Sequence, residues 1–332
     1  MDLRSLGRTG AKVSVLGFGC GAVGGLMVKG NARDQERAVA RALELGINFF
    51  DTAPLYGNGE SERNVGRVFA ALRPREVYLA TKVWVAGAER QRIAAAIDAS
   101  LTASLQRLGR EHVDLLQLHN PLSEDGSGDS LDVERVLNEV VPAFERLRQQ
   151  GKISCCGFTA LGDTSAMQRV IGAGVFAAAQ VSFNLLNPSA GAALPADYPG
   201  DNYARVLDRA KAAGVGAIGI RVLAGGALSA HETRHPLGMP KVDPIGSGID
   251  YAADVARARR LQVLVEEGHA GSLIEAALRF AITHDAMSTV LVGYSSLEQL
   301  EFAAAAVNKG PLDDAGLKRV TELQQGFCGE QR

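Results

Sequence analysis

Short apolar runs alternate with longer amphipathic segments along almost the whole chain, and this alternation constrains the fold more than any other feature. Eight runs have the length and the Val, Ile, Leu and Phe content of buried strands. Helical patterns fill most of the gaps, which is typical of repeated βα units with parallel strands. Eight such units predict an α/β fold, a closed (β/α)8 TIM barrel, rather than an open sheet. The expected strands are residues 15–19, 47–51, 77–82, 113–118, 153–157, 178–182, 215–220 and 289–292.

The expected helices lie between these strands. Several begin with an acidic or hydroxyl residue, the residue types that cap helix N-termini. Gly46 and Gly214 are placed to end two of them. The clearest helical patterns cover residues 34–45, 90–108, 131–149, 202–213, 272–284 and 296–308.

Two segments depart from the βα rhythm. Residues 1–16 predict two short strands around Gly7–Gly10, an N-terminal β-hairpin that would close the floor of the barrel. Residues 222–271 are rich in Gly and Pro and predict a long loop after strand seven, lying over the active face. No linker composition or internal repeat divides the chain, so we expect a single domain over residues 1–332.

Charge and hydropathy exclude several classes of function. Lys plus Arg number 35 and Asp plus Glu number 37, and no basic block could neutralise a run of phosphates, so nucleic acid is not an expected partner. No apolar stretch approaches the roughly 18 residues of a membrane span, and we expect no signal peptide. Four cysteines without a Cys-x-x-Cys spacing suit a reducing cytoplasm, where we expect the protein: Cys20, Cys155, Cys156 and Cys328.

The segment Gly19–Gly24 matches the G-x-G-x-x-G dinucleotide fingerprint after an expected strand. That fingerprint needs a helix to open at once, so that its N-terminus can receive a pyrophosphate. Glycines continue to Gly30 and no helix is expected before Asp34. A turn that lets the backbone approach a ligand is therefore the better interpretation.

The segment His231–His235 matches the H-E-x-x-H zinc motif, which requires both imidazoles on one face of a helix. Pro236 follows directly and disfavours a helical conformation at His235, and the preceding Ala-Gly-Gly is typical of a loop. We therefore expect a solvated loop and no metal site.

Tyr78 and Lys82 have the Tyr-x-x-x-Lys spacing that short-chain dehydrogenases place on a helix. Here the residues EVYLATKV predict a strand. Four residues along a strand span about 13 Å, too far for the ammonium to act on that phenol. Tyr78 is therefore expected in the core, and Lys82 needs another explanation.

Four polar residues end or follow consecutive strands at one rim of the predicted barrel. Strand 47–51 ends at Asp51 and runs into a loop with Tyr56, strand 77–82 ends at Lys82, and His119 follows the next strand. Each alone has an ordinary explanation, as a turn cap, a packed loop residue, a lysine reaching solvent or a core histidine. Together, at the face where barrel enzymes carry out their chemistry, they indicate a catalytic site.

These side chains suit carbonyl reduction. A tyrosine with an ordinary pKa near 10 is a weak acid at neutral pH, but a nearby ammonium lowers that pKa, and a carboxylate can hold the lysine charged. We expect Tyr56 to donate the proton, Asp51 and Lys82 to set its acidity, and His119 to hydrogen-bond the carbonyl oxygen. None of the four can supply a hydride, so a cofactor is required.

The order and spacing of these residues resemble the aldo-keto reductase family over essentially the whole chain. GINFFDTAPLYGNGESERNVG, at residues 46–66, is similar to the family signature, and the lysine strand and a His-Asn-Pro at 119–121 follow in register. The resemblance implies a (β/α)8 barrel with a nicotinamide cofactor bound over its carboxyl-terminal rim. It implies NAD(P)(H)-dependent reduction of an aldehyde or ketone, with the same four residues as the catalytic group.

The resemblance also implies binding residues. Gln180 corresponds to the glutamine that binds the nicotinamide carboxamide. RVLAGGAL, residues 221–228, resembles the loop that covers the diphosphate, and VGYSSLEQLE, residues 292–301, resembles the segment that grips the adenosine end. The implied cofactor contacts are Gly21, Asp51, Thr159, Gln180, Arg221, Leu223, Gly225, Gly293, Ser295 and Gln299. The implied substrate contacts are Trp84 and Asn120, and loops at Val23–Lys29, Trp84, Leu122–Ser130 and 222–250 would select the substrate.

Three positions depart from the family pattern. Thr159 and Ala160 stand where the family usually has Ser-Asn, so one amide contact to the nicotinamide carboxamide is missing. Ile220 stands where the family often has an aromatic residue that stacks on the nicotinamide. The adenosine segment has Tyr294, Ser295 and Gln299 where phosphate-selective members place the cations that a 2′-phosphate prefers. Members of the family usually use NADP(H), whereas the local residues favour NAD(H) or the use of both cofactors. NADP(H) is therefore expected, with NAD(H) as the alternative.

Two other functions stay open on the sequence. The acid of the reductive reaction becomes a base in reverse, so an NAD(P)-dependent dehydrogenase oxidising a sugar or other secondary alcohol is one alternative. Regulatory subunits of potassium channels also resemble this family, which makes a non-catalytic binding role a remote alternative. The presence of all four residues of the catalytic tetrad, Asp51, Tyr56, Lys82 and His119, disfavours that role. The residues do not determine the substrate, the direction or the oligomeric state.

Overall fold

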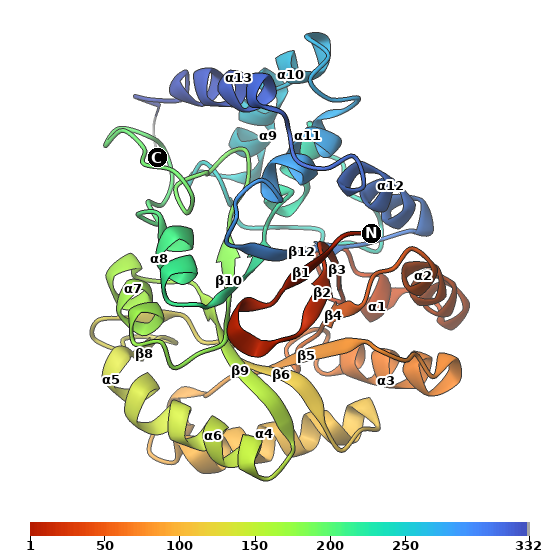
Figure 1. Ribbon diagram of the computed structural model, residues 1–332, viewed down its shortest axis with the longest axis vertical. Helices are drawn as coiled ribbons and strands as arrows, with labels where there is room; N and C mark the ends of the chain where they lie inside the picture. The colour runs from red at the N-terminus through yellow and green to blue at the C-terminus, as the bar shows by residue number, and fades with distance from the viewer. Residues whose placement is uncertain (331–332) are drawn as a thin grey trace.

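The computed structural model describes residues 1–330, and its centre is a closed barrel of eight parallel strands (Figure 1). The strands hydrogen-bond around the barrel in chain order, with β12 closing onto β3. The fold expected from the sequence is confirmed. The barrel strands are β3 (Leu16–Gly19), β4 (Phe49–Asp51), β5 (Tyr78–Val83), β6 (Val113–Leu118), β9 (Ile153–Ala160), β10 (Ala178–Ser182), β11 (Gly216–Ile220) and β12 (Met287–Gly293).

Strand β9 shows the largest difference from the expected strand ends. It continues past residue 157 to Ala160 because this part of the strand pairs in register with β10. The extension places Thr159 directly opposite Gln180. Two residues expected to contact the same end of a cofactor therefore lie side by side.

Helices surround the barrel (Figure 1). Helix α2 shows why they form: the Asn31 side chain accepts from the Asp34 amide at its N-terminus, and Ala38, Val39 and Ala42 form its buried face. Within residues 1–330, five helices match expected patterns, and their ends differ from the expected ends by at most four residues. These helices are α2 (Ala32–Glu44), α4 (Ile93–Leu108), α8 (Val206–Ala212), α11 (Leu273–Ala281) and α12 (Leu297–Val307).

The pattern at 131–149 is not one helix. It begins with β8 (Leu131–Asp132), which pairs with β7 (Leu122–Ser123), and continues through α5 (Val133–Arg135) and a π-helical turn (Val136–Val140) into α6 (Val141–Gln149). Further helices were not among the clearest patterns: α1 (Leu26–Lys29), α3 (Glu60–Leu72), α7 (Thr164–Gly172) and α13 (Asp314–Gln325), and the short 3-10 helix Gly87–Glu89.

The N-terminal hairpin forms as expected. Its strands β1 (Leu3–Ser5) and β2 (Lys12–Ser14) are antiparallel and flank a 3-10 turn at Gly7–Thr9. Leu6 and Val13 pack against the lowest inward-facing residues of the barrel, so the hairpin closes its floor. In Figure 1 this N-terminal segment crosses the centre of the barrel.

The segment 222–271 is only partly a loop. It contains a 3-10 helix (Ala224–Ser229), α9 (Tyr251–Arg260) and α10 (Val263–Glu266). Helix α9 was not predicted because the surrounding residues are rich in Gly and Pro. Its N-terminus nevertheless has an ordinary N-cap, in which the Asp250 side chain accepts from the Ala253 amide. The longest irregular part of the segment is residues 230–250.

The barrel interior changes from apolar to polar toward its carboxyl-terminal end. Because side chains alternate along a strand, residues two positions apart occupy successive layers. The apolar layer includes Phe49, Ala80, Leu115, Ala178 and Ile218. Two residues further along β4, β5, β6 and β10, the layer is polar and buried: Asp51, Lys82, Gln117 and Gln180. Within residues 1–330, no helix is long and apolar enough to cross a membrane.

Candidate active site

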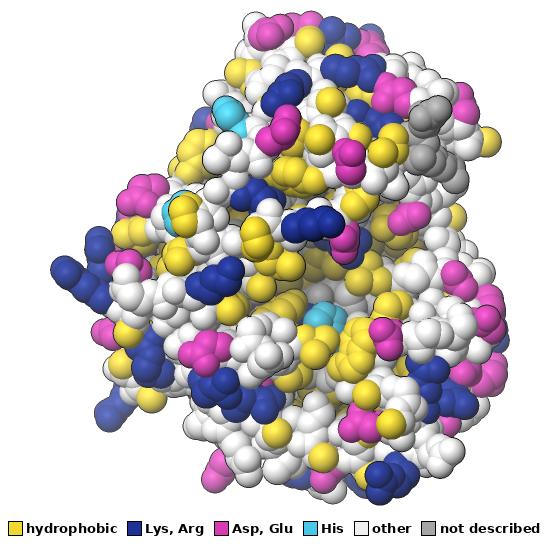
Figure 2. Space-filling view, turned by 180° about the vertical axis from the view of Figure 1, so that it is seen from behind, with side chains coloured by type: hydrophobic (Ala, Val, Ile, Leu, Met, Phe, Trp, Pro, Cys, Tyr) yellow, Lys and Arg dark blue, Asp and Glu magenta, His cyan; other side chains and the backbone are white. Residues whose placement is uncertain are grey.

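The four strand-end residues singled out by the sequence lie together at the carboxyl-terminal end of the barrel. The Lys82 ammonium donates to Asp51 Oδ2 at 2.5 Å and to the Tyr56 hydroxyl at 3.1 Å. The His119 ring meets the Tyr56 ring edge-on, with centroids 5.9 Å apart. Seen from behind the view of Figure 1, the molecule is hollowed near its centre, and a histidine lies in the hollow among hydrophobic side chains (Figure 2).

Burial and charge set the protonation of the lysine and the tyrosine. Burial lowers the pKa of Lys82, but Asp51 and Tyr56 outweigh it and the net pKa is raised, so the ammonium stays charged. For Tyr56, burial raises the pKa and outweighs the lowering by Lys82. The expectation that Lys82 would bring the phenol below its ordinary pKa is therefore not met, because desolvation of the phenolate dominates. At neutral pH Tyr56 is a neutral phenol, able to donate a proton.

His119 is neutral for a similar reason. Burial, with a smaller contribution from the Lys82 ammonium, lowers its pKa from 6.5 to about 3. Its Nδ1 atom is buried and has no hydrogen-bond partner among residues 1–330. The Trp84 ring packs edge-on against the imidazole, with centroids 6.1 Å apart. The ring can therefore offer one N–H to a substrate oxygen but no acidic proton.

Two glutamine amides complete the surroundings of Asp51. Gln180 Nε2 donates to Asp51 Oδ1 at 2.7 Å, and Gln117 Nε2 donates to the same oxygen at 3.0 Å. The sequence reasoning missed Gln117. Its position two residues before His119 on one strand was the available signal, because that spacing puts both side chains on the inner face.

Gln180 and Thr159 fit the carboxamide of a nicotinamide. Because the Gln180 amide nitrogen is held by Asp51, its oxygen is the atom available to accept from a carboxamide NH2. The neighbouring Thr159 hydroxyl is buried and has no partner among residues 1–330. A buried hydroxyl without a partner is costly unless a ligand satisfies it, so this pair supports a bound cofactor.

The 3-10 helix at 224–229 carries the predicted diphosphate loop. Gly225 is buried with a positive φ of 66°, and a Cβ there would meet Val242 of the long loop at 2.7 Å, so only glycine fits. Leu223 is half-buried beside it, and Arg221 is exposed. The Arg234 guanidinium donates to the Gly225 carbonyl, which places a second cation from the long loop at this turn. A cation held at this turn suits an anionic diphosphate.

The predicted adenosine residues are already engaged within the protein. The Ser295 hydroxyl donates to the Gly24 carbonyl at 2.6 Å, and the Ser295 amide donates to Gln299 Oε1 at 2.8 Å. Ser295 is buried, whereas Gln299 is exposed. An arginine introduced to bind a 2′-phosphate would therefore fit at position 299 but not at position 295. The sequence reasoning also missed Arg41 of α2, which pairs with Glu301 at 2.7 Å. That acidic side chain therefore does not stand alone beside the adenosine segment.

The glycine segment 19–24 is a close-packed turn. A Cβ on Gly24 would lie 2.3 Å from the Gly293 backbone, and one on Gly21 would touch the Tyr56 ring at 3.5 Å. The expectation of no helix before Asp34 is wrong, since the short α1 begins at Leu26 and α2 at Ala32. The Leu26 amide donates to the Tyr294 carbonyl, however, so this helix start does not present that amide to a pyrophosphate.

The H-E-x-x-H segment is not helical, as its Pro236 suggested. His231 Nδ1 contacts the Ser229 carbonyl at 2.6 Å, and His235 Nδ1 accepts from the Leu237 amide at 3.2 Å. Among residues 1–330, no group of three or more His, Cys, Asp or Glu side chains could hold a metal ion. Tyr78 lies on β5 with its side chain against the barrel floor.

The two predicted substrate residues differ in position. Trp84 is partly exposed and borders His119, where a substrate could touch it. Asn120 is wholly buried: its Nδ2 donates to the carbonyls of Val85 and Asp129, and its Oδ1 accepts from the Val85 amide. These contacts make Asn120 an anchor for the loop after β6 rather than a group facing the mouth of the barrel.

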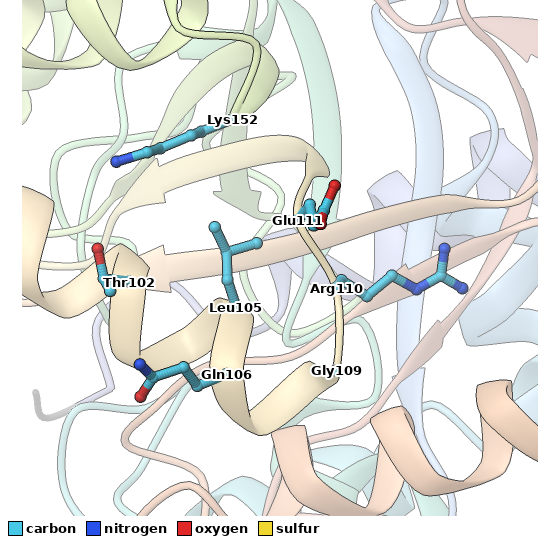
Figure 3. A pocket seen from close by; sticks show the side chains of 7 residues that line it. All are labelled: Thr102, Leu105, Gln106, Gly109, Arg110, Glu111 and Lys152. Atoms are coloured by element: carbon cyan, nitrogen blue, oxygen red, sulfur yellow. The ribbon is translucent and has the colours of Figure 1, made fainter.

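A surface hollow lies away from the catalytic residues. It is a shallow surface hollow of about 360 Å³ between the end of α4 and the start of β9 (Figure 3). The Lys152 ammonium at its edge pairs with Asp98 at 3.2 Å. Its lining contains none of the four strand-end residues.

Comparison with known proteins identifies the family of the chain. The model of the Aldo/keto reductase family matches residues 15–325. The chain belongs to the aldo/keto reductase family. This aldo/keto reductase is 31% identical to L-galactose dehydrogenase of Arabidopsis thaliana over 326 residues, covering 97% of this chain and 92% of that protein. The solved structure of aldo-keto reductase AKR11C1 from Bacillus halodurans, in its holo form, matches all of this chain and 98% of that one, with a TM-score of 0.73 at 24% identity.

Membership makes the protein an oxidoreductase of a family that uses NAD(P)H. A fission yeast protein named as a putative voltage-gated potassium channel subunit beta (Schizosaccharomyces pombe) is 34% identical, but the match covers 46% of this chain and 43% of that protein. The match to a channel subunit is therefore partial, whereas the match to the dehydrogenase spans both chains.

Proposed function

We propose that this protein is an NAD(P)(H)-dependent oxidoreductase that interconverts an aldehyde or ketone with its alcohol, with Tyr56 as the acid in reduction and the base in oxidation. The observation that carries the proposal is the 3.1 Å contact of the Tyr56 hydroxyl with a fully buried lysine paired to Asp51. A charged ammonium beside a phenol stabilises phenolate as the proton leaves. The arrangement therefore serves proton transfer in both directions.

The remaining residues supply positioning and polarisation. A substrate carbonyl oxygen between Tyr56 and His119 would receive the phenol proton and an N–H bond from the neutral imidazole. Trp84 and the hydrophobic side chains around the hollow would exclude water from that oxygen. A bound nicotinamide would supply or accept the hydride at the carbonyl carbon.

The cofactor would lie across the carboxyl-terminal rim. Gln180 and Thr159 are suited to its carboxamide, and the turn at Gly225 with Arg221 and Arg234 to its diphosphate. No lysine or arginine occurs between residues 288 and 306, and the charged side chains of this segment are Glu298 and Glu301, so the segment itself offers no cation to a 2′-phosphate. We expect both cofactors to work, with NADP(H) favoured modestly at best.

Oxidation of a sugar or other secondary alcohol is the second candidate function. One relative that matches over nearly its whole length is named as an L-galactose dehydrogenase. The absence of a cation on the adenosine segment also favours use of NAD, which suits a dehydrogenase. A non-catalytic role as a channel subunit is disfavoured because Lys82 is hydrogen-bonded to both Asp51 and Tyr56, and His119 packs against the Tyr56 ring.

A substrate and variant panel tests the proposal. Aldehydes, ketones, sugars and secondary alcohols are assayed with both cofactors by nicotinamide absorbance. Tyr56→Phe should lower kcat by about 10²–10⁴, the usual contribution of a general acid, while cofactor binding persists. Tyr78→Phe makes the same change at the barrel floor and should leave kcat near that of the wild type. Near-normal turnover by the Tyr56 variant would overturn the assignment.

A further inference from the structure

Gln117 is a buried polar residue that the expected chemistry does not use. It lies on β6 directly opposite Lys82 of β5 and is fully buried. Its Nε2 donates to Asp51 Oδ1 at 3.0 Å, while its Oε1 is buried and has no partner among residues 1–330. A buried amide with an unpaired oxygen is destabilising compared with an apolar side chain of the same shape. Packing alone therefore does not explain a glutamine here.

The contacts of Asp51 show what the amide does. Lys82 occupies Oδ2, whereas Gln117 and Gln180 both donate to Oδ1. Donors on both oxygens restrict rotation of the carboxylate, so that Oδ2 is directed at the ammonium. Of these two amide donors, Gln180 is also suited to bind the cofactor. Within the described part of the chain, Gln117 makes its polar contact with Asp51 alone.

We infer that Gln117 is a positioning residue for proton transfer at Tyr56, acting through Asp51 and Lys82. The inference rests on the proposed function of Tyr56. With the amide present, the carboxylate holds the ammonium 3.1 Å from the phenol oxygen. Without it, Asp51 can turn, the ammonium is held less firmly, and the phenolate loses part of its stabilisation.

Gln117→Met tests the loss of the donor with little change in shape. In the oxidative direction, where activity rises as Tyr56 loses its proton, kcat should fall roughly tenfold to a hundredfold, the effect of one hydrogen bond to a charged group. The rising limb of the pH profile should also move to higher pH. The KM for the cofactor should stay near that of the wild type, because Gln117 is not among the cofactor residues.

Gln117→Glu gives a signature that a structural role would not. A protonated carboxyl can donate to Asp51 as the amide does, whereas the ionised form repels it. Burial and the neighbouring carboxylate raise the pKa of a carboxyl introduced there. This variant should therefore approach wild-type kcat at acidic pH and lose activity as the pH rises, the reverse of the wild-type trend.

Gln324→Met is the matched control. Gln324 of α13 is also a buried glutamine, and its amide donates to the Leu185 carbonyl at 2.9 Å, away from the tetrad. It should lower the melting temperature without changing the pH profile. Unchanged kcat and pH profile in Gln117→Met would overturn the inference even if Tyr56→Phe is inactive. If Gln117→Met does not fold, a Gln117→Glu variant with a wild-type-shaped profile would overturn it. Full activity in Tyr56→Phe would instead overturn the proposed function.

Discussion

His119 should remain neutral across the physiological pH range, and this can be measured without a substrate. Burial, and to a smaller extent the Lys82 ammonium, lowers its pKa from 6.5 to about 3. A histidine in this state can orient a carbonyl through one N–H but cannot supply the proton of the reaction. The prediction therefore separates the role of His119 from that of Tyr56.

The depressed pKa makes stability depend on pH with a definite sign. As the pH falls below 6.5, this imidazole binds a proton in the unfolded chain, whereas in the folded protein it does so only near pH 3. The unfolded state therefore carries one more proton in this window, and folding stability is lost as the pH falls. The loss is about 1.4 kcal/mol per pH unit and approaches roughly 5 kcal/mol at the lower end.

The variant His119→Gln isolates this contribution, because it keeps a hydrogen-bonding side chain and removes the titration. Urea unfolding of both proteins is measured at a series of pH values from neutral to mildly acidic. Other titrating groups are common to both, so their effects cancel in the difference. The variant should gain stability relative to the wild type as the pH falls. In NMR spectra of histidine-labelled protein, the resonance missing from the variant should not shift over the same range.

Two results would refute this reasoning. One is a stability difference between wild type and variant that does not change with pH. The other is a His119 resonance that titrates near the ordinary pKa of 6.5, since the site would then be far more polar than its burial indicates.

The remaining predictions concern the ion pair, the histidine motif and the cofactor. Lys82→Met should cost about 3–5 kcal/mol of unfolding free energy by leaving Asp51 unpaired, whereas the double variant with Asp51→Leu should regain stability but not activity; equal stability of the two would contradict a buried pair. Because the pKa of Lys82 is raised, its contribution is present at all pH values below its ordinary pKa and is lost only as the pH rises through the raised value, so the cost should be constant across neutral pH. Activity should survive chelation and the double change of His231 and His235 to Ala; stoichiometric zinc in purified protein, with inactivation on its removal, would contradict this. Gln299→Arg should shift the NADP(H) to NAD(H) ratio of kcat/KM toward NADP(H) by about 1–3 kcal/mol, and an unchanged ratio would show that the 2′-position lies elsewhere.

Local patterns were sufficient for the barrel and for most of the tetrad. Strand length and apolar content depend on neighbours along the chain, and parallel strands end at one rim, so Asp51, Lys82 and His119 could be placed together before any contact was known. Helix α9 escaped because its signal is an ordinary cap and an alanine-rich run inside a segment dominated by glycine and proline. The π-helical turn before α6 escaped because helical periodicity does not distinguish a local change of winding.

Only the tertiary structure decided how the site is tuned. The pKa of Tyr56 depends on how completely the surrounding segments exclude water, and this balance between desolvation and the Lys82 ammonium cannot be calculated from spacing. The pairing of Gln117 with Asp51 and of Arg41 with Glu301 likewise joins residues far apart in sequence. The sequence therefore determined which chemical groups reach the rim of the barrel, and the packed structure determined their protonation and partners, because both depend on distances and solvent exclusion across the whole fold.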